Sequence, residues 1–275
     1  MARLISGVNH VHLSSAVLSV RPDPQDAKCV SLSFLSNDQV EESNGFHHIV
    51  LATQAPVAAK LLTTYLDTLQ DEFAHRKERM AALIRCLSAF ELRPSVVINH
   101  TDNSLLPDYD DDVRELNLIS LATEEYKSIH GSPTFCVPPT YTMATQVLRC
   151  PQTYSRDRPA IFQTTNPIIP PRKETIMSIA KLERGVVTVE SRRALALLCE
   201  KEPKKWWQCP YQVKTRLGPL QGARPAAEPT APGIWICGSF AHLGIPLLEG
   251  CAISARNVIE QGILKSEGVR RKEFS

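Results

Sequence analysis

Residues 233–262 have types and spacing suited to holding an electron-rich group. Residues 233–238 form an apolar run that ends in Gly238 and predicts a buried strand. A glycine-containing loop follows, and residues 249–262 predict a helix with Gly262 as its C-terminal cap. The first turn of such a helix offers unpaired N–H donors and the positive end of the helix dipole. It would stabilise a phosphate, or the negative charge that develops on a flavin during reduction. Simple packing of a helix on a strand is the alternative.

The elements around this segment predict a mixed α/β fold of the α+β type. Short runs of apolar and β-branched residues, separated by turns that contain glycine or proline, predict strands. These runs are residues 16–20, 30–35, 46–53, 95–99, 135–137, 160–165, 186–189 and 233–238. The run at residues 46–53 is apolar without alternation, which is typical of a buried strand in a parallel or mixed sheet.

Two further segments predict helices. Apolar residues recur at helical spacing in a charged segment and predict one amphipathic helix; they are Leu66, Leu69, Phe73, Met80, Leu83 and Leu87. Residues 191–199 predict a short helix with Ser191 as its N-cap. Residues 201–232 are irregular and proline-rich and contain Trp206 and Trp207, so they predict a loop that returns to another domain.

Composition and charge exclude several classes of function. The 275 residues carry a net charge of +2, which gives no reason to expect a nucleic-acid partner. Residues 233–255 form the longest weakly charged stretch, but His242, Pro246 and Glu249 argue against a membrane span. No secretory signal is apparent at the start, so we expect a cytoplasmic protein with reduced thiols.

Cysteine and histidine spacing predicts no metal site. The eight cysteines are scattered, and no two have the C-x-x-C spacing typical of structural zinc sites. The near pairs of histidines are His10 with His12 and His47 with His48. We interpret both pairs as surface or strand-edge residues.

Residues 233–262 resemble the C-terminal FAD-binding segment of the flavin-containing amine oxidoreductase family. That segment has an aromatic-containing strand, a glycine followed by a polar residue, a variable loop and a Glu-Gly-small helix start. The matching stretches here are I-W-I-C-G-S at residues 234–239 and L-E-G-C at residues 248–251. Weaker similarities fall in the family's order. Residues 16–20 resemble the strand that faces the adenine, and residues 46–53 the strand before the substrate domain. Residues 97–107 are similar to the predicted NAD/FAD-binding amine-oxidoreductase-like branch.

The resemblance implies an FAD-dependent oxidoreductase that transfers a hydride from a small organic substrate to flavin N5. It implies a remnant of a Rossmann-like FAD-binding domain, residues 1–60 and 231–268, and a mixed-sheet substrate-binding domain, residues 61–230. Residues 269–275 form a tail. It assigns no catalytic residue. The implied FAD contacts, mostly through the backbone, are Val17, Gly238, Ser239, Leu248 and Gly250.

Departures from the family pattern keep two alternatives open. The twelve glycines never take the G-x-G-x-x-G spacing that cradles the pyrophosphate, so we expect the N-terminal βαβ unit to be missing. Ser239 stands where the family usually has an acidic residue or threonine. One alternative is therefore a truncated, non-catalytic remnant or interaction protein that no longer binds FAD. A hydrolase is the other, with His100 and Asp102 but without a G-x-S-x-G nucleophile motif.

Overall fold

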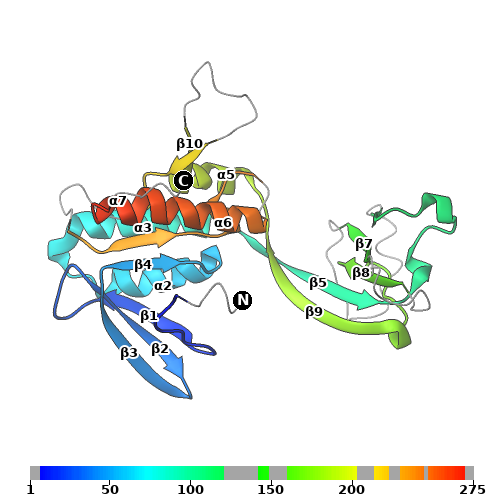
Figure 1. Ribbon diagram of the computed structural model, residues 1–275, viewed down its shortest axis with the longest axis horizontal. Helices are drawn as coiled ribbons and strands as arrows, with labels where there is room; N and C mark the ends of the chain where they lie inside the picture. The colour runs from blue at the N-terminus through cyan, green and yellow to red at the C-terminus, as the bar shows by residue number, and fades with distance from the viewer. Residues whose placement is uncertain are drawn as a thin grey trace. The chain divides into compact units, whose positions relative to one another are not determined.

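The computed structural model describes residues 7–120, 142–148, 160–202, 214–222, 230–244 and 247–269. The chain divides into two compact units, coloured by residue number in Figure 1. The first unit joins Met1–Glu91 with Gly185–Ser275, and the second is Leu92–Arg184. The predicted strand at residues 135–137, as well as Trp206 and Trp207, lies outside the described residues.

A pair of parallel strands forms the centre of the first unit. Strand β4 (His48–Leu51) pairs in parallel with β12 (Gly233–Ile236), although about 180 residues separate them in the sequence. All four residues of β12 are buried, as expected for a parallel strand with both faces covered. This confirms the predicted strand within residues 46–53 and its parallel pairing, but β4 is only partly buried: Ile49 and Leu51 are buried, whereas Val50 is 40% exposed.

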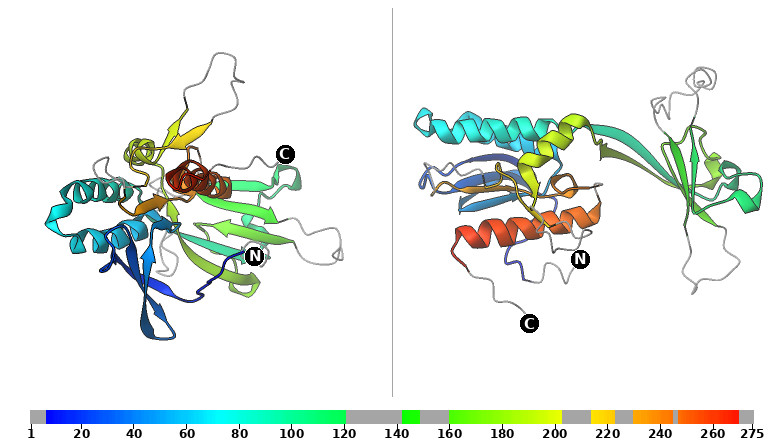
Figure 2. Two further views of the ribbon diagram at one scale, coloured as in Figure 1. Left: turned by 60° about the vertical axis from the view of Figure 1, so that its left-hand side comes forward. Right: turned by 90° about the horizontal axis from the view of Figure 1, so that it is seen from above.

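Helices pack on both faces of β12, so the centre of the unit has three layers. Ile234 and Ile236 share one apolar core with helices α2 (Ala55–Thr68) and α3 (Ala74–Ser88). On the opposite face, Trp235 and Cys237 pack with residues of the C-terminal helix. That helix runs through α6 (Leu248–Asn257), the π-helical η7 (Val258–Ile263) and α7 (Leu264–Ser266). The right-hand view of Figure 2 shows β12 between these two helical layers.

An antiparallel sheet of three strands precedes this centre. Its strands β1 (Ala16–Pro22), β2 (Val30–Ser36) and β3 (Gln39–Phe46) lie in sequence order. Asn37 and Asp38 connect β2 to β3 and both have positive φ, the conformation that a two-residue hairpin turn favours. The sequence did not predict β3, because its residues Q-V-E-E-S-N-G-F are mostly polar and exposed.

The single amphipathic helix predicted across Leu66–Leu87 is wrong. The structure has two helices there, α2 and α3, with the short helix η1 (Asp71–Phe73) between them. The backbone becomes extended at Leu69, where α2 ends. The change of chain direction between α2 and α3 lets both helices bury their apolar faces in the same core. Their apolar residues therefore keep helical spacing along the sequence although they belong to two helices.

The segment after residue 185 also differs from its prediction. Residues 186–189 do not form the expected strand, and helix α5 (Val189–Leu198) begins there. Thr188, rather than Ser191, is the N-cap. The two side chains form a reciprocal capping box in which each accepts a hydrogen bond from the other's backbone N–H. A two-stranded antiparallel sheet follows, made of β10 (Cys199–Lys201) and β11 (Thr215–Leu217).

The second unit is a five-stranded sheet with the order β6-β7-β8-β5-β9. Its pairs β6–β7, β7–β8 and β8–β5 are antiparallel, and hydrogen bonds at both ends of β5 and β9 show that these two strands also run antiparallel, so the mixed sheet predicted for this part of the chain is wrong. Its strands are β5 (Leu92–His100), β6 (Leu116–Ile119), β7 (Met143–Leu148), β8 (Ile161–Thr165) and β9 (Ile176–Gly185). The short helices η2 (Asn103–Leu105), η3 (Asp110–Asp112) and η5 (Lys173–Thr175) connect them. The predicted strands at residues 95–99 and 160–165 correspond to β5 and β8. Strand β9 was not predicted, because it is exposed along almost its whole length.

The mixed α/β fold of the α+β type is confirmed. The domain boundary expected between residues 60 and 61 falls inside α2, which belongs wholly to the first unit. The second unit is therefore shorter than the predicted substrate-binding domain at residues 61–230. The Rossmann-like character of the first unit and the missing βαβ unit stay predictions. No helix in the described ranges is long and apolar enough to cross a membrane.

Gly262 does not cap the C-terminal helix, contrary to the prediction. The helix continues to Ser266 and ends at Gly268, which has a φ of +67°. The Gly268 N–H donates to the Lys265 carbonyl and the Val269 N–H to the Leu264 carbonyl, the hydrogen-bond pattern of a Schellman motif. Gly262 instead lies against the Trp235 ring, where a Cβ atom would come within 2.4 Å of it. A glycine is needed here because the helix and strand approach closely.

We predict that Gly262→Ala destabilises the first unit. Overpacking costs about 1–3 kcal/mol, whereas the better helix propensity of alanine returns at most about 1 kcal/mol. Gly222 also lies close to the Trp235 ring, where an added Cβ atom would come within 3.0 Å of it, so the ring has little room to move. The expected net loss is about 1–2 kcal/mol, measured by urea denaturation. Gly185→Ala is the control, because a Cβ atom there meets no atom within 4 Å. A Gly262→Ala protein as stable as the wild type would contradict this packing.

Candidate functional site

The loop after β12 is fastened to helix α6 by one serine. Gly238 has a φ of +149°, a conformation that favours glycine. Its N–H donates to the Ser254 hydroxyl at 3.0 Å, and this hydroxyl donates back to the Gly238 carbonyl at 3.1 Å. The end of the strand therefore has a fixed position relative to the start of the helix.

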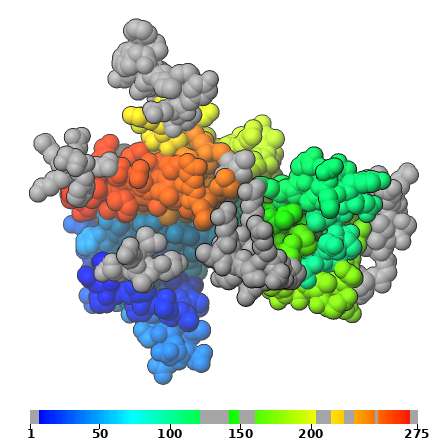
Figure 3. Space-filling model, turned by 45° about the vertical axis from the view of Figure 1, so that its right-hand side comes forward, coloured from blue at the N-terminus to red at the C-terminus, as the bar shows by residue number. Residues whose placement is uncertain are grey.

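Gly238, Ser239 and Gly250 come together at the start of α6. A Cβ atom on Gly250 would lie 3.2 Å from the Ser239 carbonyl oxygen, so the small residue permits close approach of the loop. Leu248, the first residue of the helix, is 88% exposed. The helix has no side-chain N-cap, and Glu249 is the acidic residue of its first turn. The C-terminal helix lies at the surface of the first unit (Figure 3).

The fifth predicted FAD contact, Val17, belongs to a different element. It lies in β1, which pairs with β2 in the three-stranded sheet. The Val17 side chain is half-exposed, and a bulge interrupts the pairing between Val17 and Ser19. The structure thus brings three of the predicted residues together, sets Leu248 beside them in the same helix turn, and places Val17 in a separate sheet.

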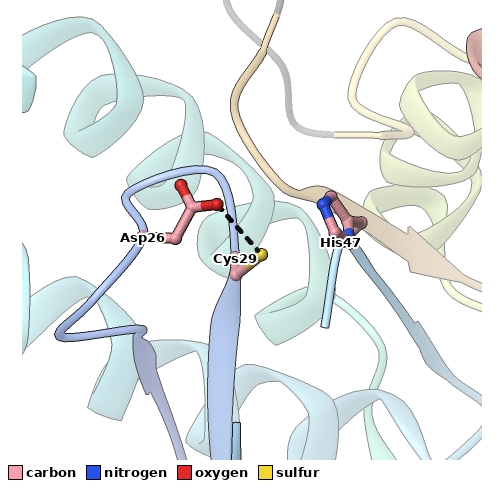
Figure 4. Close-up of side chains that lie close together, drawn as sticks. All are labelled: Asp26, Cys29 and His47. Atoms are coloured by element: carbon pink, nitrogen blue, oxygen red, sulfur yellow. Dashed lines mark hydrogen bonds between the residues drawn. The ribbon is translucent and has the colours of Figure 1, made fainter. Parts of the chain in front are cut away.

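A second group of side chains was not predicted from the sequence. Asp26, Cys29 and His47 each offer one donor atom, and these three atoms lie within 4.8 Å of one another. The Cys29 thiol donates to Asp26 Oδ2 at 3.7 Å, and the His47 ring faces them (Figure 4). Burial, together with the nearby Asp26 carboxylate, raises the pKa of the Cys29 thiol. Asp26 and Cys29 are three residues apart, but an aspartate paired with a cysteine is not among the close Cys and His pairs that indicate a structural zinc site.

The buried Asp23 carboxylate fixes both segments that carry this group. It accepts hydrogen bonds from the backbone N–H groups of Gln25 and Asp26 in the β1–β2 loop, and from Gly45 in β3 at 2.7 Å. These bonds, the one from Gln25 foremost, lower the pKa of Asp23. Arg76 of α3 also donates to the Ala27 carbonyl of the loop. The loop is therefore tied to the chain that leads into His47.

His48, the neighbour of His47, has a structural role. Its Nδ1 accepts from Trp235 Nε1 at 3.0 Å, and its Nε2 donates to the Glu267 carboxylate at 2.7 Å. His48 therefore contacts Trp235 and the C-terminal helix, whereas His47, in the bend before β4, lies beside Asp26 and Cys29.

His100 and its surroundings form a buried hydrogen-bond network in the second unit. The Asp102 N–H donates to His100 Nδ1 at 3.1 Å, so the proton of the neutral ring is on Nε2 and is donated to the Thr164 hydroxyl at 2.7 Å. The Thr164 hydroxyl also contacts that of Thr145 at 2.9 Å. Burial lowers the pKa of His100. Because His100 and Thr164 are both 0% exposed, this histidine and hydroxyl hold the sheet together and do not favour the hydrolase alternative.

The Asp102 carboxylate extends this network to an arginine. It accepts the Arg172 backbone N–H at 2.8 Å and a guanidinium N–H at 3.0 Å. It also accepts the hydroxyl and backbone N–H of Ser104. Burial alone would raise the pKa of Asp102, but the hydrogen bonds from Arg172 and Ser104 outweigh it and hold this pKa well below its usual range.

No protein-family model matches the sequence, and no curated protein is significantly similar to it.

We predict that Asp102→Asn lowers the free energy of unfolding by about 1–3 kcal/mol at pH 7, the usual size of a lost charge-assisted hydrogen bond. The pKa of Asp102 is depressed by folding, so its contribution is present above the unfolded value near 3.8 and is lost as the pH falls further. The difference between wild type and variant, measured by urea denaturation, should therefore stay constant from pH 7 down to about pH 5 and shrink as the pH falls below about 4. The exposed Asp108→Asn is the control. A difference that grew on acidification would contradict the assignment.

Proposed function

We propose that the protein is an FAD-dependent oxidoreductase that binds the flavin at the N-terminus of α6. The main support for this proposal is the structure of the N-terminus of α6. It follows a buried strand and a glycine loop, it has no side-chain N-cap, and its first residue Leu248 is almost fully exposed. The first N–H groups of a helix have no partner within the helix and attract negative charge.

The arrangement of β4 and β12 supports the proposal. The resemblance assigned both segments to the FAD-binding part, and they lie side by side in one parallel pair. Ligands of open α/β sheets bind outside the carboxyl ends of the strands. Gly238 and Ser239 follow directly after the carboxyl end of β12, and Gly250 packs against them. The three layers centred on β12 are those of an α/β arrangement with helices on both faces of the strand.

Bound FAD would supply the hydride acceptor at its N5 atom, and the substrate would be a small organic molecule. The role of this chain would be to position the flavin and to stabilise charge. The first-turn N–H groups of Leu248, Glu249 and Gly250 would donate toward the flavin edge that becomes negative on reduction. Ser254 would act indirectly, by holding the Gly238 loop against the helix. A cytoplasmic location also belongs to this proposal.

Two variants of Leu248 test the flavin site with little risk to folding. Leu248→Glu puts a negative charge beside the proposed flavin, whereas Leu248→Gln has nearly the same shape without charge. The added repulsion of about 1–2 kcal/mol in a partly exposed site corresponds to roughly tenfold weaker FAD binding. We expect Leu248→Gln to bind as the wild type does, with affinity measured by titrating the protein into FAD and following flavin fluorescence anisotropy.

The same titration separates the proposal from its alternative. Wild-type protein that binds no FAD would favour the non-catalytic remnant. Equal FAD affinity of the Glu and Gln variants would mean that the flavin binds somewhere other than the start of α6.

A further inference from the structure

Asp26, Cys29 and His47 combine the three donor types that zinc binds in proteins, namely a carboxylate oxygen, a thiolate sulfur and an imidazole nitrogen. They come from the β1–β2 loop and from the residue just before β4. Figure 4 shows the three side chains directed toward one another. We propose that they bind one Zn²⁺ ion, with the fourth coordination position open to water or another small ligand.

The spacing of the donors fits a tetrahedral ion. Bonds of about 2.3 Å to sulfur and about 2.0–2.2 Å to oxygen place those two ligands about 3.5 Å apart. The Cys29 sulfur and Asp26 Oδ2 are 3.7 Å apart, so an ion fits between them with almost no movement. All three donor atoms lie within 4.8 Å of one another. A rotation of the His47 side chain that moved its ring nitrogen by about 1 Å would bring all three atoms to coordination distance from one ion.

Charge and donor chemistry select the ion. Coordination releases the Cys29 proton to solvent, and the thiolate and the Asp26 carboxylate together then neutralise the two positive charges of the metal. A thiolate with an imidazole favours zinc over Mg²⁺ or Ca²⁺, which prefer oxygen ligands throughout. Three protein ligands and an open position are typical of zinc sites that bind water or a substrate group, whereas structural sites use four protein ligands.

The surroundings prepare this geometry before any ion arrives. The Asp23 carboxylate binds the backbone N–H of Asp26 and that of Gly45, two residues before His47. The Asp26 carbonyl accepts the Cys29 N–H at 2.9 Å, and Asp26 Oδ1 accepts the Lys28 N–H at 2.9 Å. The second carboxylate oxygen, Oδ2, faces the thiol. Hydrogen bonds that orient ligating groups in this way are typical of metal sites.

Cobalt(II) is the probe that reports directly on the ligands. The full chain, stripped with a chelator and kept free of FAD, would be titrated with Co²⁺ and followed by absorption. We expect one ion per chain, visible bands of a four-coordinate ion and a near-ultraviolet thiolate-to-cobalt charge-transfer band. Cys29→Ser should abolish the charge-transfer band. Cys251→Ser is the control, because Cys251 is a free cysteine on α6, outside the group, and is more exposed than the buried Cys29; it should keep the band.

Zinc affinity, measured by competition with a chromophoric chelator, tests the other two ligands. Loss of an outer-sphere group already weakens metal binding 10–100-fold, so His47→Ala and Asp26→Asn should each weaken Zn²⁺ binding by at least about tenfold. His75→Ala, an exposed histidine on α3, should leave the affinity within about twofold. Asp26→Asn keeps an oxygen for the Lys28 N–H, so it tests the charge with the loop intact, and circular dichroism checks that each variant is folded.

Three results would overturn the proposal. They are a wild-type titration without the charge-transfer band, a band that survives in folded Cys29→Ser, or zinc affinity that is unchanged in both His47→Ala and Asp26→Asn. None of these results depends on FAD binding, because the experiment is done without the cofactor.

Discussion

Strands β4 and β12 are far apart in the sequence, and their pairing has to close a loop that contains the whole second unit. The entropy lost in closing a loop grows only slowly with its length, so a well-packed core can offset it. Ile234 and Ile236 supply one side of that core, and Trp235 and Cys237 the other. The remaining edge of β12 is covered by Gln221, whose amide donates to the Ile236 carbonyl and accepts the Ile236 N–H. Without this pairing, neither the C-terminal helix nor α2 and α3 would have a common surface to cover.

The same strand pair separates the two candidate sites. In a parallel pair, the amino ends of both strands lie together, and so do their carboxyl ends. His47 precedes β4 at the amino end of the pair, whereas Gly238 follows β12 at the carboxyl end. The proposed zinc site and the proposed flavin site therefore lie at opposite ends of one pair of strands. The neighbouring histidines have different roles at the amino end of β4. His48 forms hydrogen bonds with Trp235 and Glu267, whereas His47 lies beside Cys29.

The sequence predicted elements where apolar residues concentrate. β4, β12, β5 and β8 are visible as apolar runs because both faces or one face is buried. Strands β3 and β9 were not predicted because their side chains are mostly exposed. Hydrogen bonding to a neighbouring strand, rather than burial of apolar side chains, stabilises them. The break between α2 and α3 is set by the tertiary packing of both helices, which apolar spacing alone does not encode.

The candidate sites show the same limit. Gly238, Ser239 and Gly250 are close in the sequence and were predicted together, whereas Asp26, Cys29 and His47 meet only through the fold of the three-stranded sheet. The role of Gly262 was misread because a glycine near the end of a helix is most often a cap. Here it makes room for the Trp235 ring, a contact between segments that spacing along one helix does not reveal.

If the start of α6 holds the flavin, bound FAD should slow the hydrogen exchange of the backbone amides there. Mass spectrometry of the chain with and without FAD would follow the exchange of peptides across the molecule. We expect slower exchange in the first turn, at Leu248, Glu249 and Gly250, and unchanged exchange in the exposed strand β9. Protection confined to other segments, or no protection at saturating FAD, would contradict flavin binding at the start of α6.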